Sequence, residues 1–170
     1  MSELLKNIVR FVLLLLLQVF VLDKIVLNVY ATPYLYMLFV LLLPFSIPRW
    51  GLMAAAVLLG LCLDMFTDTP GMHAAACLVI AYARPFVINI LSPQGGFETV
   101  RKTPSVAAMG WAPFMTYATI LVLIHHVVYF SLEVFDFHNL LMLVLKILLS
   151  AVSSLVMIAI YEMLFTPRHR

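Results

Sequence analysis

The sequence predicts an all-α, polytopic membrane protein with six transmembrane helices, and three observations carry this prediction. Hydrophobic residues make up 65% of the 170 positions and charged residues only 11%, with a mean hydropathy of +1.11, which is far from the range of soluble domains. The apolar residues form runs that approach the length a helix needs to cross the hydrocarbon layer. No linker, repeat or low-complexity tract divides the chain, so we expect one integral membrane domain over residues 1–170.

Each expected transmembrane helix follows from an apolar segment and its flanking residues. The segments cover approximately residues 8–22, 33–47, 50–66, 72–91, 106–132 and 140–165. The first resembles a signal peptide, but no small-residue cleavage site follows it, so we expect an uncleaved anchor. The second and third are separated only by SIPRW, whose proline predicts a tight helical hairpin. Pro85 is expected to kink the fourth, and the polar stretch SPQGGFETVRKTPS separates it from the fifth and sixth.

The basic residues predict the orientation of these helices. With the N-terminus in the cytoplasm, the following residues all fall on the cytoplasmic side: Lys6, Arg10, Arg49, Arg101, Lys102, Arg168 and Arg170. Among the loops on the opposite side, only Lys24 is basic. Because short loops rich in Lys and Arg stay in the cytoplasm, we expect both termini on the cytoplasmic side.

Two carboxylates stand at the end of the third segment, in GLCLDMFTDTPGMHAAA (residues 60–76). Gly60, Asp64 and Asp68 are spaced four apart and therefore share one helix face. Asp68 precedes a Pro-Gly turn and is expected to be solvated. Asp64 is one turn deeper, where a charge costs about 3 kcal/mol and is usually paired or functional. Lys146 in the sixth segment is the candidate partner, although a lysine at that depth can also extend its amine to the headgroups.

A row of small residues also runs along the third segment, formed by Gly51, Ala55, Ala56 and Gly60. Small residues spaced in this way allow two helices to approach closely in lipid. Two uses of the row are open: Gly60 could face the Ala-rich start of the fourth helix, and Ala55 could face the helix of a partner protein.

The residues give little support for catalysis, metal binding or nucleic-acid binding. Two carboxylates are too few for the divalent-metal site of a membrane phosphotransferase. The adjacent His125 and His126 cannot both face one metal on a straight helix, and His73 stands apart from them in the sequence. No P-loop, dinucleotide-binding fingerprint or Ser-His-Asp arrangement occurs, and a net charge of +2 is too small to indicate a nucleic-acid partner. We therefore expect no enzymatic activity, no metal and no cofactor.

The segment GLCLDMFTDTPGMHAAACLVIAY resembles the signature region of the MreD family, the rod shape-determining membrane proteins of bacteria. The matching residues are Gly60, Asp64, Thr67, Thr69, Gly71, Ala81 and Tyr82. The run LLLLLQ, which ends at Gln18, and the hairpin LPFSIPRWG are also similar, and the size and six-helix plan agree across essentially the whole chain. Asp68 departs from the pattern, because a small residue is expected there.

The resemblance implies a non-enzymatic scaffold in the bacterial inner membrane that helps to organise peptidoglycan synthesis and cell shape. The implied partners are a single-span MreC-like protein, the actin-like MreB filament, and the transpeptidase and glycosyltransferase of cell elongation, with membrane lipid around the helices. The family also resembles, in fold, the membrane substrate-binding subunits of energy-coupling vitamin transporters. Such a subunit is the alternative function, and Asp64, His73 and Tyr82 are the residues that could line its pocket.

Overall fold

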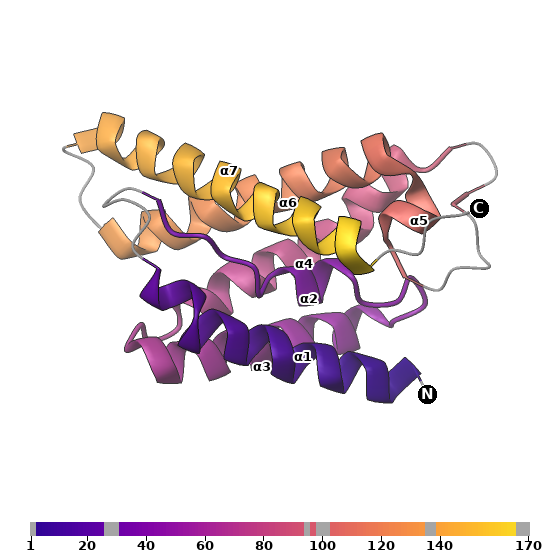
Figure 1. The fold of residues 1–170 in the computed structure, drawn as a ribbon, viewed down its shortest axis with the longest axis horizontal. Coiled ribbons are helices and arrows are strands. Elements are labelled where there is room, and N and C mark those ends of the chain that lie inside the picture. The colour runs from indigo at the N-terminus through magenta and orange to yellow at the C-terminus, as the bar shows by residue number, and fades with distance from the viewer. Residues whose placement is uncertain (1–2, 26–30, 94–95, 98–102, 135–138, 166–170) are drawn as a thin grey trace.

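The computed structural model describes residues 3–25, 31–93, 96–97, 103–134 and 139–165, and all its regular elements are helices apart from a single bridge residue at Ala31. In chain order the elements are α1 (Glu3–Phe20), the 3-10 turn η1 (Leu22–Lys24), α2 (Leu38–Leu41), α3 (Arg49–Thr67), α4 (Met72–Leu91), α5 (Val106–Met109), α6 (Trp111–Val134) and α7 (Leu140–Phe165). The long helices lie roughly side by side in an elongated bundle, and α1 begins at the same end of it as α7 finishes (Figure 1).

Five helical segments within the described residues are long and apolar enough to cross a membrane. They are Glu3–Lys24, Arg49–Thr67, Met72–Leu91, Trp111–Val134 and Leu140–Phe165. Five of the six expected segments therefore correspond to helices, with ends that differ by a few residues. The helix expected over 106–132 is divided at Gly110, whose φ of 84° separates α5 from α6, and α4 continues through Pro85.

The prediction of a spanning helix over residues 33–47 is wrong. Only Leu38–Leu41 are α-helical there, and the residues before and after them form turns and irregular backbone. We call residues 31–48 the central segment. It runs between α1 and α7 (Figure 1), and every residue from 33 to 43 is buried. Irregular backbone is tolerated at membrane depth only where protein surrounds it, because lipid offers its N–H and C=O groups no hydrogen bonds.

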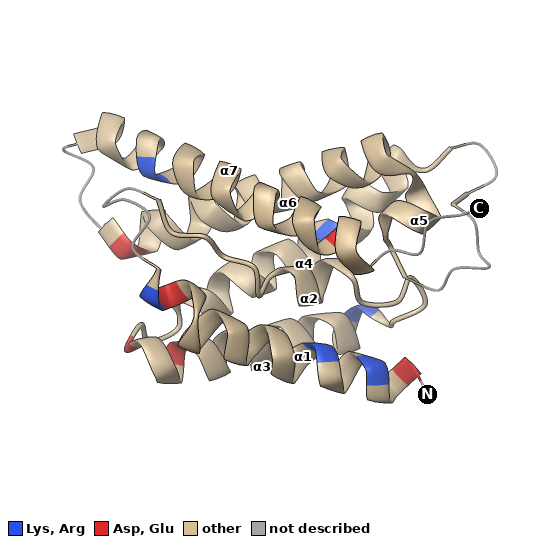
Figure 2. Ribbon diagram, viewed as in Figure 1, with Lys and Arg blue, Asp and Glu red and all other residues tan. Residues whose placement is uncertain are grey.

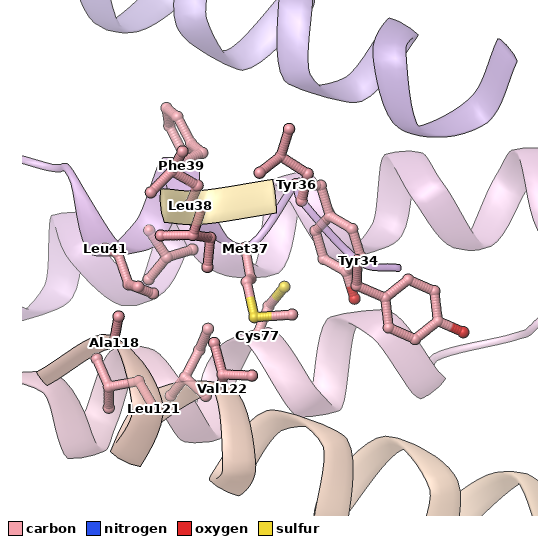
Figure 3. Close-up of a cluster of buried hydrophobic side chains, with 14 of the residues drawn as sticks. Tyr34, Tyr36, Met37, Leu38, Phe39, Leu41, Cys77, Ala118, Leu121 and Val122 are labelled. Carbon is pink, nitrogen blue, oxygen red and sulfur yellow. The ribbon is translucent and has the colours of Figure 1, made fainter. Parts of the chain in front are cut away.

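The core forms around this segment. Side chains of the central segment pack against α4 and α6 (Figure 3). The contact includes Tyr36, Leu38 and Leu41 of the central segment, Cys77 of α4, and Leu121 and Val122 of α6. Helix α3 packs against α4, α4 against α6 and α6 against α7. Helix α1 is peripheral, since it buries only one face, formed by Leu14, Leu15, Gln18 and Val19. Most of its remaining side chains are apolar and exposed to the surroundings of the bundle.

Most charged residues lie toward the two ends of the bundle, and one blue and one red segment lie between them (Figure 2). Lys6 and Arg10 lie in the first half of α1 and Arg49 is the first residue of α3, and both helices begin at one end. Asp68 and Glu133 belong to the ends of α3 and α6 at the other. This separation is consistent with the predicted orientation, although the expected cytoplasmic residues Arg101, Lys102, Arg168 and Arg170 lie outside the described residues.

Candidate functional site

The carboxylate of Asp64 caps a neighbouring helix. Its Oδ1 accepts a hydrogen bond from the backbone N–H of His73, and its Oδ2 accepts one from the N–H of Ala74, each at 3.0 Å. These belong to the first turn of α4, where N–H groups have no partner within the helix. The capping residue of α4 is Gly71, which has no side chain to bind them. Asp64 therefore serves as an N-cap supplied by α3, and its negative charge lies at the positive end of the α4 dipole.

Thr69 and the imidazole of His73 complete the surroundings of this carboxylate. Thr69 Oγ1 donates to Oδ1 of Asp64 at 3.0 Å, and Nδ1 of His73 lies 2.9 Å from the same oxygen. Thr67 Oγ1 is 2.7 Å from Thr69 Oγ1 and donates to the carbonyl of Leu63. With the side chain of Asp64 only 5% exposed, all these contacts are internal. The acidic motif thus forms a hydrogen-bonded junction between α3 and α4.

Gly60 allows this junction to form. A Cβ atom built at Gly60 would lie 2.4 Å from Cα of Ala74, a separation that would force the backbones apart. Of the two uses of the small-residue row that the sequence left open, the structure shows the one in which Gly60 faces the start of α4. Ala56, one turn earlier, is fully buried, whereas Ala55 and Gly51 are half-buried at the edge of the packed face.

The proposed pairing of Asp64 with Lys146 is wrong. The amine of Lys146 lies 2.5 Å from Oε2 of Glu133 and 4.8 Å from the centre of the Phe130 ring. Asp64 finds its donors on α4 and in the α3–α4 turn instead. Sequence spacing could not reveal this, because the depth of Lys146 says nothing about which helix it faces.

Asp68 and Gly71 have the turn roles that the sequence indicated. Asp68 is exposed and ends α3 in the left-handed conformation, with a φ of 54°. Gly71 has a φ of 82° and nothing within 4 Å of where a Cβ would be, so backbone conformation explains the glycine. Neither residue contributes a side chain to the interior.

Tyr82 does not join Asp64 and His73 in a pocket. Its side chain is 61% exposed on the outside of α4, and its ring packs 5.4 Å from that of Phe86. The ring of His73 instead points into the bundle, with its centre 4.6 Å from Tyr129 and 5.8 Å from Tyr34.

A buried cluster of tyrosines and histidines lies beside the junction. We call it the aromatic cluster, and its members are Tyr34, Tyr36, His73, His125, His126 and Tyr129. The hydroxyl of Tyr36 is 2.6 Å from Nε2 of His125, and Nε2 of His126 is 3.3 Å from Oγ of Ser154. Nδ1 of His125 is the only buried side-chain nitrogen or oxygen of the described residues without a hydrogen-bond partner. No group of three or more potential metal ligands occurs in that same part of the chain.

Polar side chains of α1 and α7 form hydrogen bonds with the backbone of the N-terminal half of the central segment. Gln18 on α1 donates to the carbonyl of Pro33 at 3.1 Å and accepts from the N–H of Leu35 at 2.9 Å. On α7, Oγ of Ser154 accepts from the N–H of Tyr34 at 2.8 Å. These bonds replace those a helix would have made within itself.

The C-terminal half of the central segment is held by hydrogen bonds to its backbone carbonyl groups. The hydroxyl of Tyr117 donates to the carbonyl of Leu41 at 2.9 Å, and Arg10 donates to that of Leu42 at 3.2 Å. The guanidinium of Arg84 donates to the carbonyl of Leu43. Sequence reasoning missed these contacts, and the available signal was a set of isolated polar residues inside apolar helices.

Together, five apolar helices of spanning length and a hydrogen-bonded polar interior define a multi-pass helical membrane protein. Comparison of the chain with models of protein families, with curated proteins and with solved structures finds no match.

Proposed function

We propose that the protein is a non-enzymatic scaffold of the bacterial cell-elongation complex, located in the inner membrane and acting with an MreC-like single-span protein. The observation that carries the proposal is the structural role of the motif that resembles the MreD signature region. Gly60, Asp64 and Thr69 serve to join α3 to α4, and both oxygens of Asp64 are occupied by that junction. A motif used in this way suits a protein that presents fixed surfaces to partners.

The exposed faces of the bundle supply surfaces of the required kind. Helices α1 and α7 expose apolar side chains along their lengths, and part of this area is available to partner helices as well as to lipid. On α3, Ala55 is half-buried and Ala54 is exposed, so small residues reach the surface beside the packed face.

Site-specific crosslinking tests the proposal. A photoreactive residue introduced at successive positions from Trp50 to Phe66 in living cells should give adducts with an MreC-like protein that recur every three to four residues on one face. Ala55→Leu should abolish those adducts and the co-purification of the partner while the abundance of the protein stays normal. Absence of any elongation protein among adducts from α1, α3 and α7 would contradict the scaffold function.

The alternative is a substrate-binding subunit of an energy-coupling vitamin transporter, and the aromatic cluster favours it. Stacking rings and an imidazole nitrogen with no partner among the described residues are features of a ligand site. Native mass spectrometry of the protein released from its own membrane distinguishes the two. A vitamin retained in stoichiometric amount, and lost on His125→Phe, would favour the transporter.

A further inference from the structure

A cationic pocket lies where α3 begins and α4 ends, away from the aromatic cluster and the Asp64 junction. Its volume is about 340 Å³. Its polar lining comes from Arg49, Arg84, Asn89 and Ser92, and its apolar lining includes Phe45 and Ile88. No carboxylate belongs to the lining. Two guanidinium groups and two neutral hydrogen-bonding side chains therefore surround one space.

Arg84 carries its charge into this pocket from a buried position. The residue is 2% exposed, and it lies seven residues before the end of α4, about 10 Å along the helix axis. Its Nε donates to the hydroxyl of Tyr117 at 3.0 Å, and its Nη2 to the carbonyl of Leu43. Both acceptors are neutral, and no carboxylate of the described residues forms an ion pair with Arg84. Buried charges are normally paired, so this arrangement calls for an anion.

Arg49 approaches the same pocket from the surface. It is the first residue of α3, and its guanidinium carbon lies 5.7 Å from the centre of the Phe86 ring on α4. This contact holds the side chain against α4. Arginine suits phosphate better than lysine does, because its planar fork can donate two parallel hydrogen bonds.

A shallow, largely apolar groove with a volume of about 20 Å³ borders the pocket between α3 and α4. It is lined by Arg49, Met53, Ala81, Tyr82, Pro85 and Phe86, so that Arg49 and Pro85 border both spaces. Tyr82 is 61% exposed and Phe86 is 48% exposed, which places the groove on the outer surface of the bundle. A cationic pocket at a helix end that borders a shallow groove with exposed aromatic side chains matches a ligand with an anionic head and a hydrocarbon tail, whose chain would lie over the groove.

We propose that this pocket binds one anionic phospholipid, with its phosphate on Arg49 and Arg84 and an acyl chain along the groove beside Tyr82 and Phe86. Basic pockets between transmembrane helices bind anionic headgroups in this manner. The site is independent of the scaffold proposal, since it requires no protein partner.

Native mass spectrometry tests the site. The protein is reconstituted in vesicles of equal parts phosphatidylglycerol and phosphatidylethanolamine, extracted in mild detergent, and scored for the lipid that it retains. We expect one phosphatidylglycerol to be retained preferentially. Arg49→Gln should weaken its retention by about fivefold to tenfold, the range for losing one charge-assisted contact. Lys6→Gln is the control, because it removes the same charge from the same end of the bundle but from an exposed pair with Glu3.

Further variants separate the head from the tail. Ser92→Leu should fill the pocket and weaken retention of phosphatidylglycerol without removing a charge, and Arg84→Gln should do the same provided that its thermal unfolding shows a folded protein. Millimolar inorganic phosphate should not displace the lipid. The proposal would be overturned by an equal loss of phosphatidylglycerol retention in Arg49→Gln and Lys6→Gln, by no preference for phosphatidylglycerol over phosphatidylethanolamine, or by full displacement of the lipid by phosphate.

Discussion

At the scale of single residues, the chemistry of Asp64 depends on the backbone that it meets. A carboxylate inside an apolar bundle is costly, and here two main-chain N–H groups, a hydroxyl and an imidazole offset that cost. Asp68, four residues later, faces out and only ends a helix. The two residues have the same side chain but different surroundings, so they should respond differently to the same substitution.

Asp64→Ala should destabilise the protein by about 1–3 kcal/mol, because it leaves the N–H groups of His73 and Ala74 buried without an acceptor. Thermal unfolding in detergent measures this effect, and Asp68→Ala, at an exposed position, is the matched control with an expected change within about 0.5 kcal/mol. Under the proposed function, Asp64→Ala should also give rounder cells than Asp68→Ala. Equal stabilities of the two variants would contradict the capping role.

Gly60→Ala should lower the abundance and the unfolding temperature of the protein, since the added Cβ would lie 2.4 Å from Cα of Ala74. Gly51→Ala serves as the control on the same helix. Its Cβ would meet only the ring of Pro48 at 3.4 Å and the side chain of Ile47 at 3.6 Å, and Ala is the better helix former by about 0.5–1 kcal/mol. If both variants accumulate to the level of the unmodified protein, α3 and α4 are not in close contact at Gly60.

At the scale of elements, the central segment is the feature that distinguishes this bundle. Its apolar composition suits a transmembrane helix, yet its backbone is irregular and is held by side chains from α1, α4, α6 and α7. Pro33, Pro44 and Pro48 interrupt the run, and Gln18 and Ser154 supply the bonds that the missing helix would have made. The segment and the helices around it therefore depend on each other for stability.

Ser154→Ala should destabilise the protein by about 1–3 kcal/mol, since the N–H of Tyr34 would lose its acceptor in a dry interior. The neighbouring Ser153→Ala is the matched control, because Ser153 is half-buried and its hydroxyl bonds only to the carbonyl of Ser150 in its own helix. Chemical unfolding of both variants in detergent makes the comparison. A change of the same size in the two would mean that the central segment does not rely on α7.

At the scale of the whole molecule, the path of the chain sets the positions of its ends. Helix α1 starts and α7 finishes at the same end of the bundle (Figure 1), an arrangement in which the central segment takes the place of one helical crossing. The basic residues at the starts of α1 and α3 lie at that same end. The positive-inside rule then predicts that this end faces the cytoplasm.

Topology reporters test this orientation. Fusions after Arg170 and within 94–103 should report the cytoplasm, whereas fusions within 23–32, at Thr69 and within 133–138 should report the opposite side of the membrane. A matched pair of reporters with opposite compartment requirements at each position controls for poor expression. Three crossings, by α4, α6 and α7, should separate Thr69 from Arg170. Arg170 reporting the same side as Thr69 would show that the chain crosses the membrane an even number of times between these positions and would contradict the predicted orientation.

The sequence by itself determined the membrane class, the five long helices, the turn at Asp68 and Gly71, and the row of small residues that includes Gly60. These follow from local properties: hydropathy, helix length, turn residues and the absence of a side chain. Only the tertiary structure decided that residues 33–47 do not form a spanning helix, that Asp64 caps α4 and does not pair with Lys146, and that Tyr82 faces outward. Each of these depends on which atoms of distant segments meet, and in an apolar bundle every helix has several faces that composition alone makes equally suitable for packing.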